Sequence, residues 1–168
     1  MSARLLSLDL PVFPEQKTFR LADATGSPDG QAGPMPPMGS LICASREQMW
    51  VGSLQEHVGV HVTLEEWDGA PAPCGGDWED EAKAVLYVRG SVTLGAGQTG
   101  PAAVGKLRLA GGVGDYVVRV YARNRREVVK LYRELYERGL DPLSDEFQAA
   151  RHGLEGQERY LLQLWRES

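Results

Sequence analysis

The chain has 168 residues and a mass of 18.4 kDa, with 42% hydrophobic and 24% charged residues, which is the usual size and composition of one folded domain. Its formal net charge of −5 disfavours direct binding to nucleic acid, because such proteins carry a basic face that neutralises phosphates. No apolar run approaches the roughly 20 residues that cross a bilayer, and residues 1–11 lack the pattern of a signal peptide. We therefore expect a cytoplasmic protein that forms a single domain over residues 1–168 and binds no membrane.

Alternation of apolar and polar residues predicts β-strands along most of the chain. The clearest example is residues 57–67, where Val58, Val60, Val62 and Leu64 alternate with polar residues and so share one face. Residues 84–94 are apolar on both faces, as in a central strand. In chain order, the predicted strands are residues 3–10, 17–22, 41–43, 49–51, 57–67, 84–94, 105–109, 116–122 and 158–165.

Two segments depart from this alternation. Residues 24–39 are rich in Gly, Pro, Ser and Asp and predict a flexible loop. Residues 124–153 predict a helical insertion, because an apolar stripe with a period of 3.6 begins after a possible cap at Asn124 and stops at Gly139. A second, shorter helix is expected from Ser144 to Gly153.

The order of these elements predicts a mainly β fold. We expect an antiparallel β-sandwich or a jelly-roll-like arrangement, with one or two helices inserted before the last strand. An up-and-down barrel that encloses a ligand is the alternative, because the same strands could close on themselves.

The sequence contains no recognisable catalytic, metal or cofactor motif. His57 and His61 would lie roughly 13 Å apart on one strand, too far to share a zinc ion, so we expect surface histidines. Residues 95–100 spell G-x-G-x-x-G, but no helix follows that could hold a pyrophosphate. Cys43 and Cys74 fit no ligand spacing and are expected to be reduced. We therefore predict no catalytic residue, no metal and no cofactor.

The strongest candidate for a binding surface is acidic. Seven acids and no basic residue lie between Glu65 and Glu81, together with Trp67 and Trp78. Such charge steers a basic partner, and an aromatic residue ringed by charge is typical of an interface hot spot. Trp67 follows the buried side of its strand, so Trp78 is the better interface candidate. The predicted partner-binding residues are Trp78, Asp77, Glu79, Asp80 and Glu81.

Three segments carry a resemblance to known proteins: Trp78-Glu79-Asp80, the strand from Gly114 to Tyr121 and the strand from Arg159 to Trp165. In this order they resemble segments of uncharacterised, notably actinobacterial, β-rich proteins. That set is distantly similar to the competence protein J family of nuclease inhibitors. The resemblance covers about residues 55–165 and implies a small β-rich inhibitor that binds a protein. It transfers no functional residue.

These observations favour a protein-interaction module, an inhibitor or immunity-type protein that binds a basic protein such as a nuclease or toxin. Two alternatives remain open. The first is a small-molecule-binding barrel or cryptic enzyme, which a cavity with His57 or His61 beside carboxylates would favour. The second is a structural subunit of a homo-oligomer, which would pair through the helix or through an edge strand.

Overall fold

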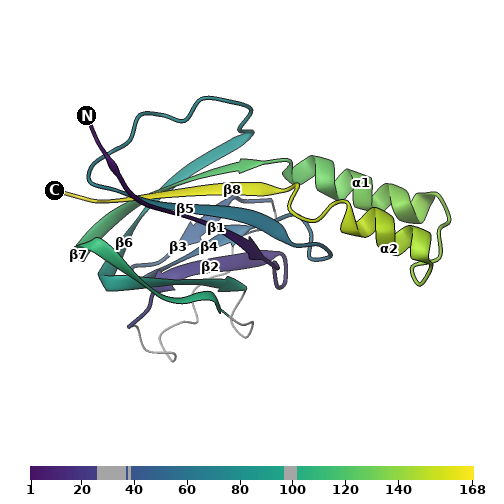
Figure 1. Cartoon of the computed structure of the whole chain (residues 1–168), viewed down its shortest axis with the longest axis horizontal. Coiled ribbons are helices and arrows are strands. Elements are labelled where there is room, and N and C mark those ends of the chain that lie inside the picture. Colours follow the sequence, from purple (N-terminus) through teal and green to yellow (C-terminus); the bar gives the residue numbers. More distant parts are fainter. Residues whose placement is uncertain (26–36, 38, 97–101) are drawn as a thin grey trace.

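The computed structural model of the chain describes residues 1–25, 37, 39–96 and 102–168 (Figure 1). Eight strands form a single sheet in the order β1-β5-β8-β7-β6-β2-β4-β3, so the mainly β prediction is confirmed. The predicted loop at 24–39 and the glycine motif at 95–100 lie largely outside the described residues. The strands are β1 (Arg4–Val12), β2 (Thr18–Asp23), β3 (Ile42–Ala44), β4 (Gln48–Gly52), β5 (Val60–Trp67), β6 (Asp80–Ala96), β7 (Ala102–Arg123) and β8 (Arg159–Arg166).

The sheet is mixed, which corrects the prediction that it would be entirely antiparallel. Strands β5 and β8 run parallel, with His61 opposite Arg159 and Trp67 opposite Trp165. On its other side, β8 pairs antiparallel with β7, whose end connects to β8 through the two helices. After the two helices, the chain therefore enters β8 beside β5 and runs in the same direction as β5.

The two predicted strands at 105–109 and 116–122 are one long strand, β7, which pairs with the long strand β6. Both strands turn where a glycine has a positive φ, +100° at Gly90 and +72° at Gly112, a conformation that favours glycine. The β6–β7 register also shifts between Arg89 and Ser91. Because of this bend, the two halves of each strand have different neighbours, and the sheet curves around its core without closing into a barrel.

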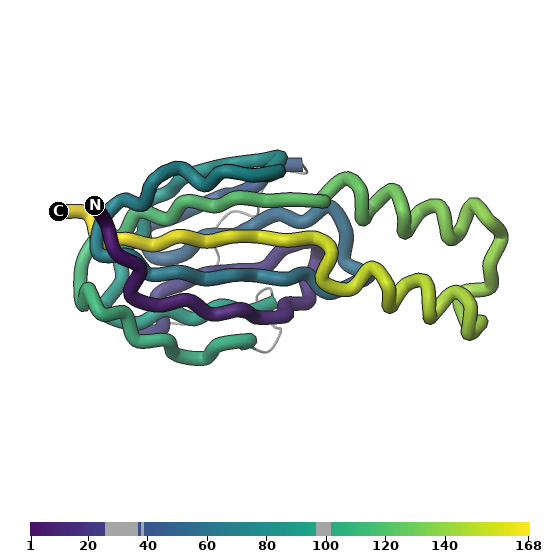
Figure 2. Tube along the Cα trace, turned by 45° about the horizontal axis from the view of Figure 1, so that its top comes forward, coloured from purple at the N-terminus to yellow at the C-terminus, as the bar shows by residue number. Residues whose placement is uncertain are grey.

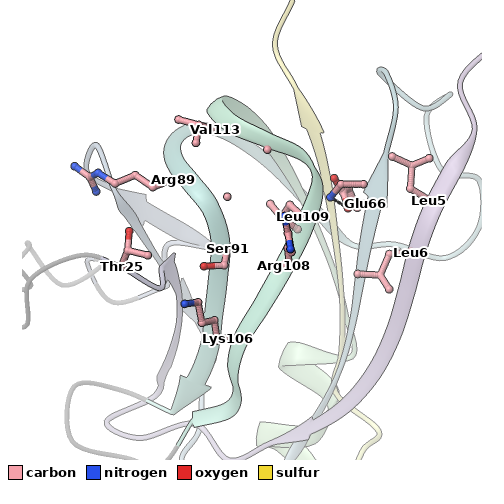
Figure 3. A pocket seen from close by; sticks show the side chains of 13 residues that line it. Leu5, Leu6, Thr25, Glu66, Arg89, Ser91, Lys106, Arg108, Leu109 and Val113 are labelled. Atoms are coloured by element: carbon pink, nitrogen blue, oxygen red, sulfur yellow. Dashed lines mark hydrogen bonds between the residues drawn. The ribbon is translucent and has the colours of Figure 1, made fainter.

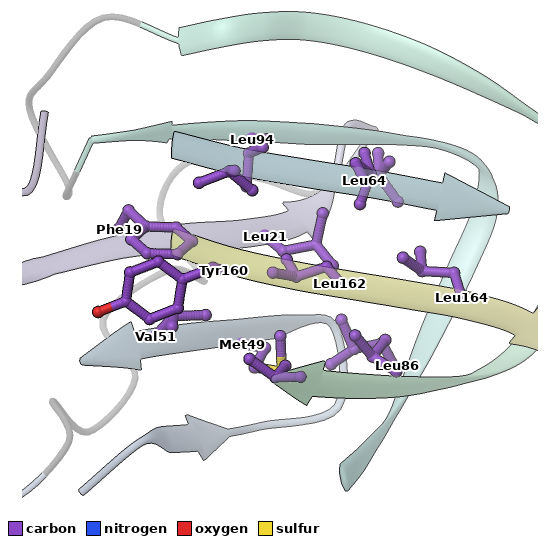
Figure 4. Close-up of a cluster of buried hydrophobic side chains, with 14 of the residues drawn as sticks. Phe19, Leu21, Met49, Val51, Leu64, Leu86, Leu94, Tyr160, Leu162 and Leu164 are labelled. Carbon is purple, nitrogen blue, oxygen red and sulfur yellow. The ribbon is translucent and has the colours of Figure 1, made fainter. Parts of the chain in front are cut away.

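The core lies inside this curved sheet (Figure 4). It is built from rows of alternate residues on facing strands, as the sequence predicts for β5 and β8. Phe19 and Tyr160 meet edge to face with their ring centroids 4.9 Å apart, and both are fully buried. The other large, fully buried residues of this cluster include Leu21, Met49, Leu64, Leu86, Leu94 and Leu162.

Helices α1 (Arg125–Glu137) and α2 (Asp145–His152) form a hairpin that projects from the sheet at the end opposite the two termini (Figure 2). The predicted ends at Ser144 and Gly139 are confirmed: the Ser144 side chain accepts the Phe147 N–H at 3.2 Å, and Gly139 has φ +72°. Asn124 is the N-cap residue of α1, as predicted, but its side chain makes no capping hydrogen bond. Asn124 has φ 65° and its side chain donates to the Gln157 carbonyl, so it ties α1 to the segment before β8. No helix in the described residues is both long and apolar enough to span a membrane.

The base of the hairpin packs on the segment before β5 through a small second cluster of Val58, Val128 and Leu154. His57 lies before β5 and stacks on Tyr132 of α1, with ring centroids 4.3 Å apart. The expectation of a strand that carries both His57 and His61 is therefore wrong. His57 instead packs against an aromatic residue of α1, a contact that the alternation in the sequence does not predict.

Candidate partner-binding site

Trp78 lies just before β6, where that strand meets the end of β7. Its ring packs on Tyr121, with centroids 5.7 Å apart, and the Arg123 guanidinium lies 5.6 Å from its centroid. Tyr121 is buried, whereas Trp78 is half-buried. These contacts hold the indole in place and leave part of it at the surface, the arrangement of an aromatic anchor.

Two of the predicted acids fasten the helical hairpin to the sheet. The Asp80 carboxylate lies 3.2 Å from Arg125 and 3.7 Å from Arg126, and the Glu79 carboxylate accepts the Asn124 N–H at 3.1 Å. Both carboxylates thus stand at the N-terminus of α1, where a negative charge is favourable. Arg125 is itself buried at 1% exposure, so the Asp80 carboxylate faces a guanidinium that is shielded from solvent.

Asp77 and Glu81 are the free members of the acidic group. Both side chains are exposed, and within the described residues neither has an ion pair or a side-chain hydrogen bond. Glu79 is also exposed, although one of its oxygens is occupied by the helix. The surface negative charge is therefore concentrated on Asp77, Glu79 and Glu81 around Trp78, and Arg125 and Arg126 offset part of the Asp80 charge.

The other acids of the 65–81 stretch lie elsewhere in the fold. Glu65 is buried and accepts hydrogen bonds from Gln163 and Trp67. Glu66 is buried too, and its two oxygens accept the N–H groups of Ala110 and Gly111, each at 2.9 Å. The Asp68 carboxylate accepts the Ala3 N–H. Asp68 is exposed as well, but most of the exposed acids that the sequence suggested over the whole stretch lie at residues 77–81.

The loop that leads to Trp78 is held by a buried arginine. Arg119 donates to the carbonyl oxygens of Pro71 and Ala72 at 2.9 and 3.1 Å, and its guanidinium lies between the rings of Tyr121 and Trp165. The Tyr121 hydroxyl in turn accepts the Cys74 N–H. This loop is thereby positioned over the outer face of β7 and β8.

A second polar cluster is enclosed below the hairpin. Glu158 is fully buried, and its carboxylate accepts hydrogen bonds from Ser53, Gln55 and Tyr160 at 2.8 to 3.1 Å. Burial raises the pKa of Glu158, against the opposing effects of these donors and of the positive Arg125. Sequence reasoning missed this cluster, yet the alternation of Tyr160, Leu162 and Leu164, continued two residues back, places Glu158 on the buried face.

The small-molecule alternative finds a modest structural counterpart at His61. Its Nε2 lies 3.4 Å from the Asp9 carboxylate at a hollow of about 290 Å³, which Glu155 also lines. The Glu155 carboxylate accepts the Gly59 N–H, and Asp9 accepts the Thr63 hydroxyl. The described residues contain no group of three or more His, Cys, Asp or Glu that could hold a metal ion.

Comparison with known proteins defines the fold class and no more. No family model matches the chain, and no curated protein matches it. Two solved structures resemble it along nearly their whole length. The first is ComJ, an inhibitor of the DNA-degrading activity of NucA from Bacillus subtilis, with a TM-score of 0.56 and 8% identity over 99% of both chains. The second is the product of crocagin biosynthetic gene J, with a TM-score of 0.55 and 14% identity over 100% of this chain and 99% of the other.

Proposed function

We propose that this chain is an inhibitor or immunity-type interaction module that binds a basic protein, such as a nuclease or toxin, through residues 77–81. Its scaffold is the bent sheet, which we class as a β-sandwich-like module. The observation that carries the proposal is the exposed acidic segment around a fixed indole, on a fold that resembles a nuclease inhibitor over its whole length. Structural likeness at such low identity supports the fold, and the binding role rests on the surface.

The four acids of residues 77–81 differ in whether they already have partners in the fold. Asp77 and Glu81 have no partner in the described chain, so they can meet a basic side chain without first breaking an internal ion pair. Trp78 supplies the apolar contact, and its packing on Tyr121 and Arg123 reduces the entropy that binding would cost. Glu79 and Asp80 contribute negative potential while they hold α1.

The test is affinity capture from the native cell lysate at low and high salt, with mass spectrometry of the bound proteins. We expect the wild-type protein to retain a basic protein that salt releases. The variant D77N/E79Q/D80N/E81Q should lose it. A matched control changes four exposed acids elsewhere to glutamine, namely Glu56, Glu127, Glu137 and Glu167, and removes the same charge.

The outcome separates specific contact from general charge. Equal loss in both quadruple variants would show that only net charge matters, and unchanged capture by D77N/E79Q/D80N/E81Q would refute the proposed surface. The narrower variant D77N/E81Q avoids the hairpin contacts of Glu79 and Asp80, so a loss of capture in this variant does not come from a displaced helix.

A further inference from the structure

The two halves of β7 differ in how their edges are used. Residues from Tyr116 to Ala122 pair with β6 on one side and with β8 on the other. From Ala102 to Arg108 the strand pairs with β6 alone, and in the described part of the chain no strand occupies its second edge. A row of backbone donors and acceptors without a strand partner is a template for another strand.

A second open edge lies nearby. Strand β1 is at the end of the sheet, with β5 as its neighbour. A cavity of about 690 Å³ is lined by Leu5 and Leu6 of β1 and by Lys106, Arg108 and Leu109 of β7 (Figure 3). Leu5 is 48% exposed although it is apolar. The groove therefore offers apolar side chains together with strand edges.

At the bend of β7, side chains of the same chain form hydrogen bonds with the backbone N–H and C=O groups. The second edge of the first half of β7 has no strand partner in the described chain. Glu66 accepts the N–H groups of Ala110 and Gly111, Arg166 donates to the Gly111 carbonyl, and the Tyr116 hydroxyl donates to the Gly112 carbonyl. Along residues 102–109, the Thr93 hydroxyl of the already paired strand β6 donates to the Val104 carbonyl, and the described chain has no other side-chain hydrogen bond to the backbone of these residues. The contrast marks the first half of β7 as the place where an added strand would find unused groups.

Charge indicates what that strand would carry. Lys106 and Arg108 are exposed on the face of β7 opposite Leu107 and Leu109, and neither forms an ion pair within the described residues. Arg89, at the same groove, is already held by Asp23 and Glu47. Opposite charges on neighbouring strands stabilise their pairing, so acidic residues at alternate positions fit beside Lys106 and Arg108.

We propose that the free edge of β7 at residues 102–109 binds an extended segment of a partner protein by strand addition, with acidic residues beside Lys106 and Arg108 and apolar residues on its other face. This surface goes beyond the proposed function. It lies at the opposite end of the β6–β7 ladder from Asp80, and its charge preference is the reverse of that of residues 77–81. It recognises an extended backbone, whereas residues 77–81 recognise a basic surface.

The probe is a blocked peptide of alternating valine and glutamate, about eight residues long to match residues 102–109. Two-dimensional NMR spectra of the isotope-labelled protein should show shifts at the amides of residues 102–109 and at Leu5 and Leu6. The variant K106E/R108E should bind about tenfold more weakly and should prefer a valine–lysine peptide. Both substitutions are at exposed positions, so an unchanged melting temperature confirms the fold.

Further controls isolate strand pairing. Peptides N-methylated at alternate residues keep every side chain but lose one hydrogen-bonding edge, so at least one of the two methylation registers should lose binding. Equal binding of both methylated peptides, shifts confined to other regions, or no shifts at millimolar peptide would overturn the proposal. So would equal binding of a single-stranded oligonucleotide at these amides, or self-association of the free protein through them. D77N/E81Q should bind the peptide as tightly as the wild type does. A failure of the acidic surface at residues 77–81 would therefore leave this result unchanged.

Discussion

Acidic side chains have opposite roles in two regions of this protein. Glu66 and Glu158 are buried at the ends of core-facing rows, where each accepts at least two hydrogen bonds. Asp77 and Glu81 are exposed beside Trp78 and accept none from side chains of the described chain. The comparison shows that donors and burial, rather than the count of acids in a stretch, decide whether a carboxylate stabilises the fold or remains available to a partner.

The largest effect is expected at Glu158. The substitution Glu158→Ala removes the acceptor for Ser53, Gln55 and Tyr160 and leaves Arg125 without a nearby buried anion, so the free energy of unfolding should fall by about 3–5 kcal/mol. Urea unfolding measures this loss. A change below about 1 kcal/mol would show that the cluster relaxes or fills with water.

The pH dependence of the same residue tests its burial. Because the pKa of Glu158 is raised in the folded protein, the folded state holds its proton more tightly, and the resulting stability is fully present below the usual value of 4.5. That stability is lost as pH rises from 4.5 through the folded pKa. Glu158→Gln stays neutral, so its free energy of unfolding minus that of the wild type should increase with pH over this window. A flat or falling difference would contradict the raised pKa.

Glu66 should rank next. Glu66→Ala removes the acceptor for two backbone N–H groups at the bend of β7, and we expect a loss of about 2–3 kcal/mol in the free energy of unfolding. Glu66→Gln keeps one acceptor oxygen and should lose about half as much. Burial, followed by the charge of Glu66, raises the pKa of Tyr116 to about 12, so absorbance titration should find a lower Tyr116 pKa in Glu66→Gln. An unchanged value would argue against the proximity of these groups.

Trp78 is intermediate between the buried and the exposed residues, since one side of its ring is packed and part of it is exposed. Trp78→Ala loses the contacts with Tyr121 and Arg123 and should lower the free energy of unfolding by about 1–2 kcal/mol, less than the truncation of a core aromatic residue. Thermal unfolding of Trp78→Phe, which keeps a ring on Tyr121, is the matched control. A loss as large as that of a core tryptophan would mean that the indole is structural and not an interface anchor.

The smallest effect is expected for D77N/E81Q. Neither side chain has a partner in the described chain, so the free energy of unfolding should change by less than about 0.5 kcal/mol. Chemical denaturation of this variant beside the wild type measures the change. A larger loss would show that these carboxylates stabilise the fold, and the contrast with Glu66 and Glu158 would then disappear.

Several features of the fold could be predicted because they depend on neighbours in the chain. Alternation identified the core-facing rows of β5 and β8, and the cap at Ser144 and the stop at Gly139 follow from local backbone geometry. The same alternation, continued by two residues, would also have placed Glu66 and Glu158 on the buried face. A carboxylate is rarely buried without partners, and the partners of Glu66 and Glu158 are distant in sequence, so the pattern alone does not justify burial of these two residues.

The candidate site could be predicted only in outline. Trp78 and residues 77–81 lie together because they are consecutive, and their place beside Tyr121 and Arg123 depends on the β6–β7 pairing. That pairing also brings Asp80 to Arg125 and Arg126, which removes part of the predicted negative surface. Counting charges along the chain does not reveal ion pairs between residues that are far apart in the sequence, such as Asp80 and Arg125.

By itself, the sequence determined the core-facing rows of β5 and β8, the helix boundaries at Gly139 and Ser144 and that the protein is mainly β, because side-chain period and capping are local properties. The tertiary structure alone decided that β8 runs parallel to β5, that two predicted strands form one bent β7, and which carboxylates are buried or free. The physical reason is that a strand's period sets its buried face, whereas its partner is selected by the packing of the whole chain.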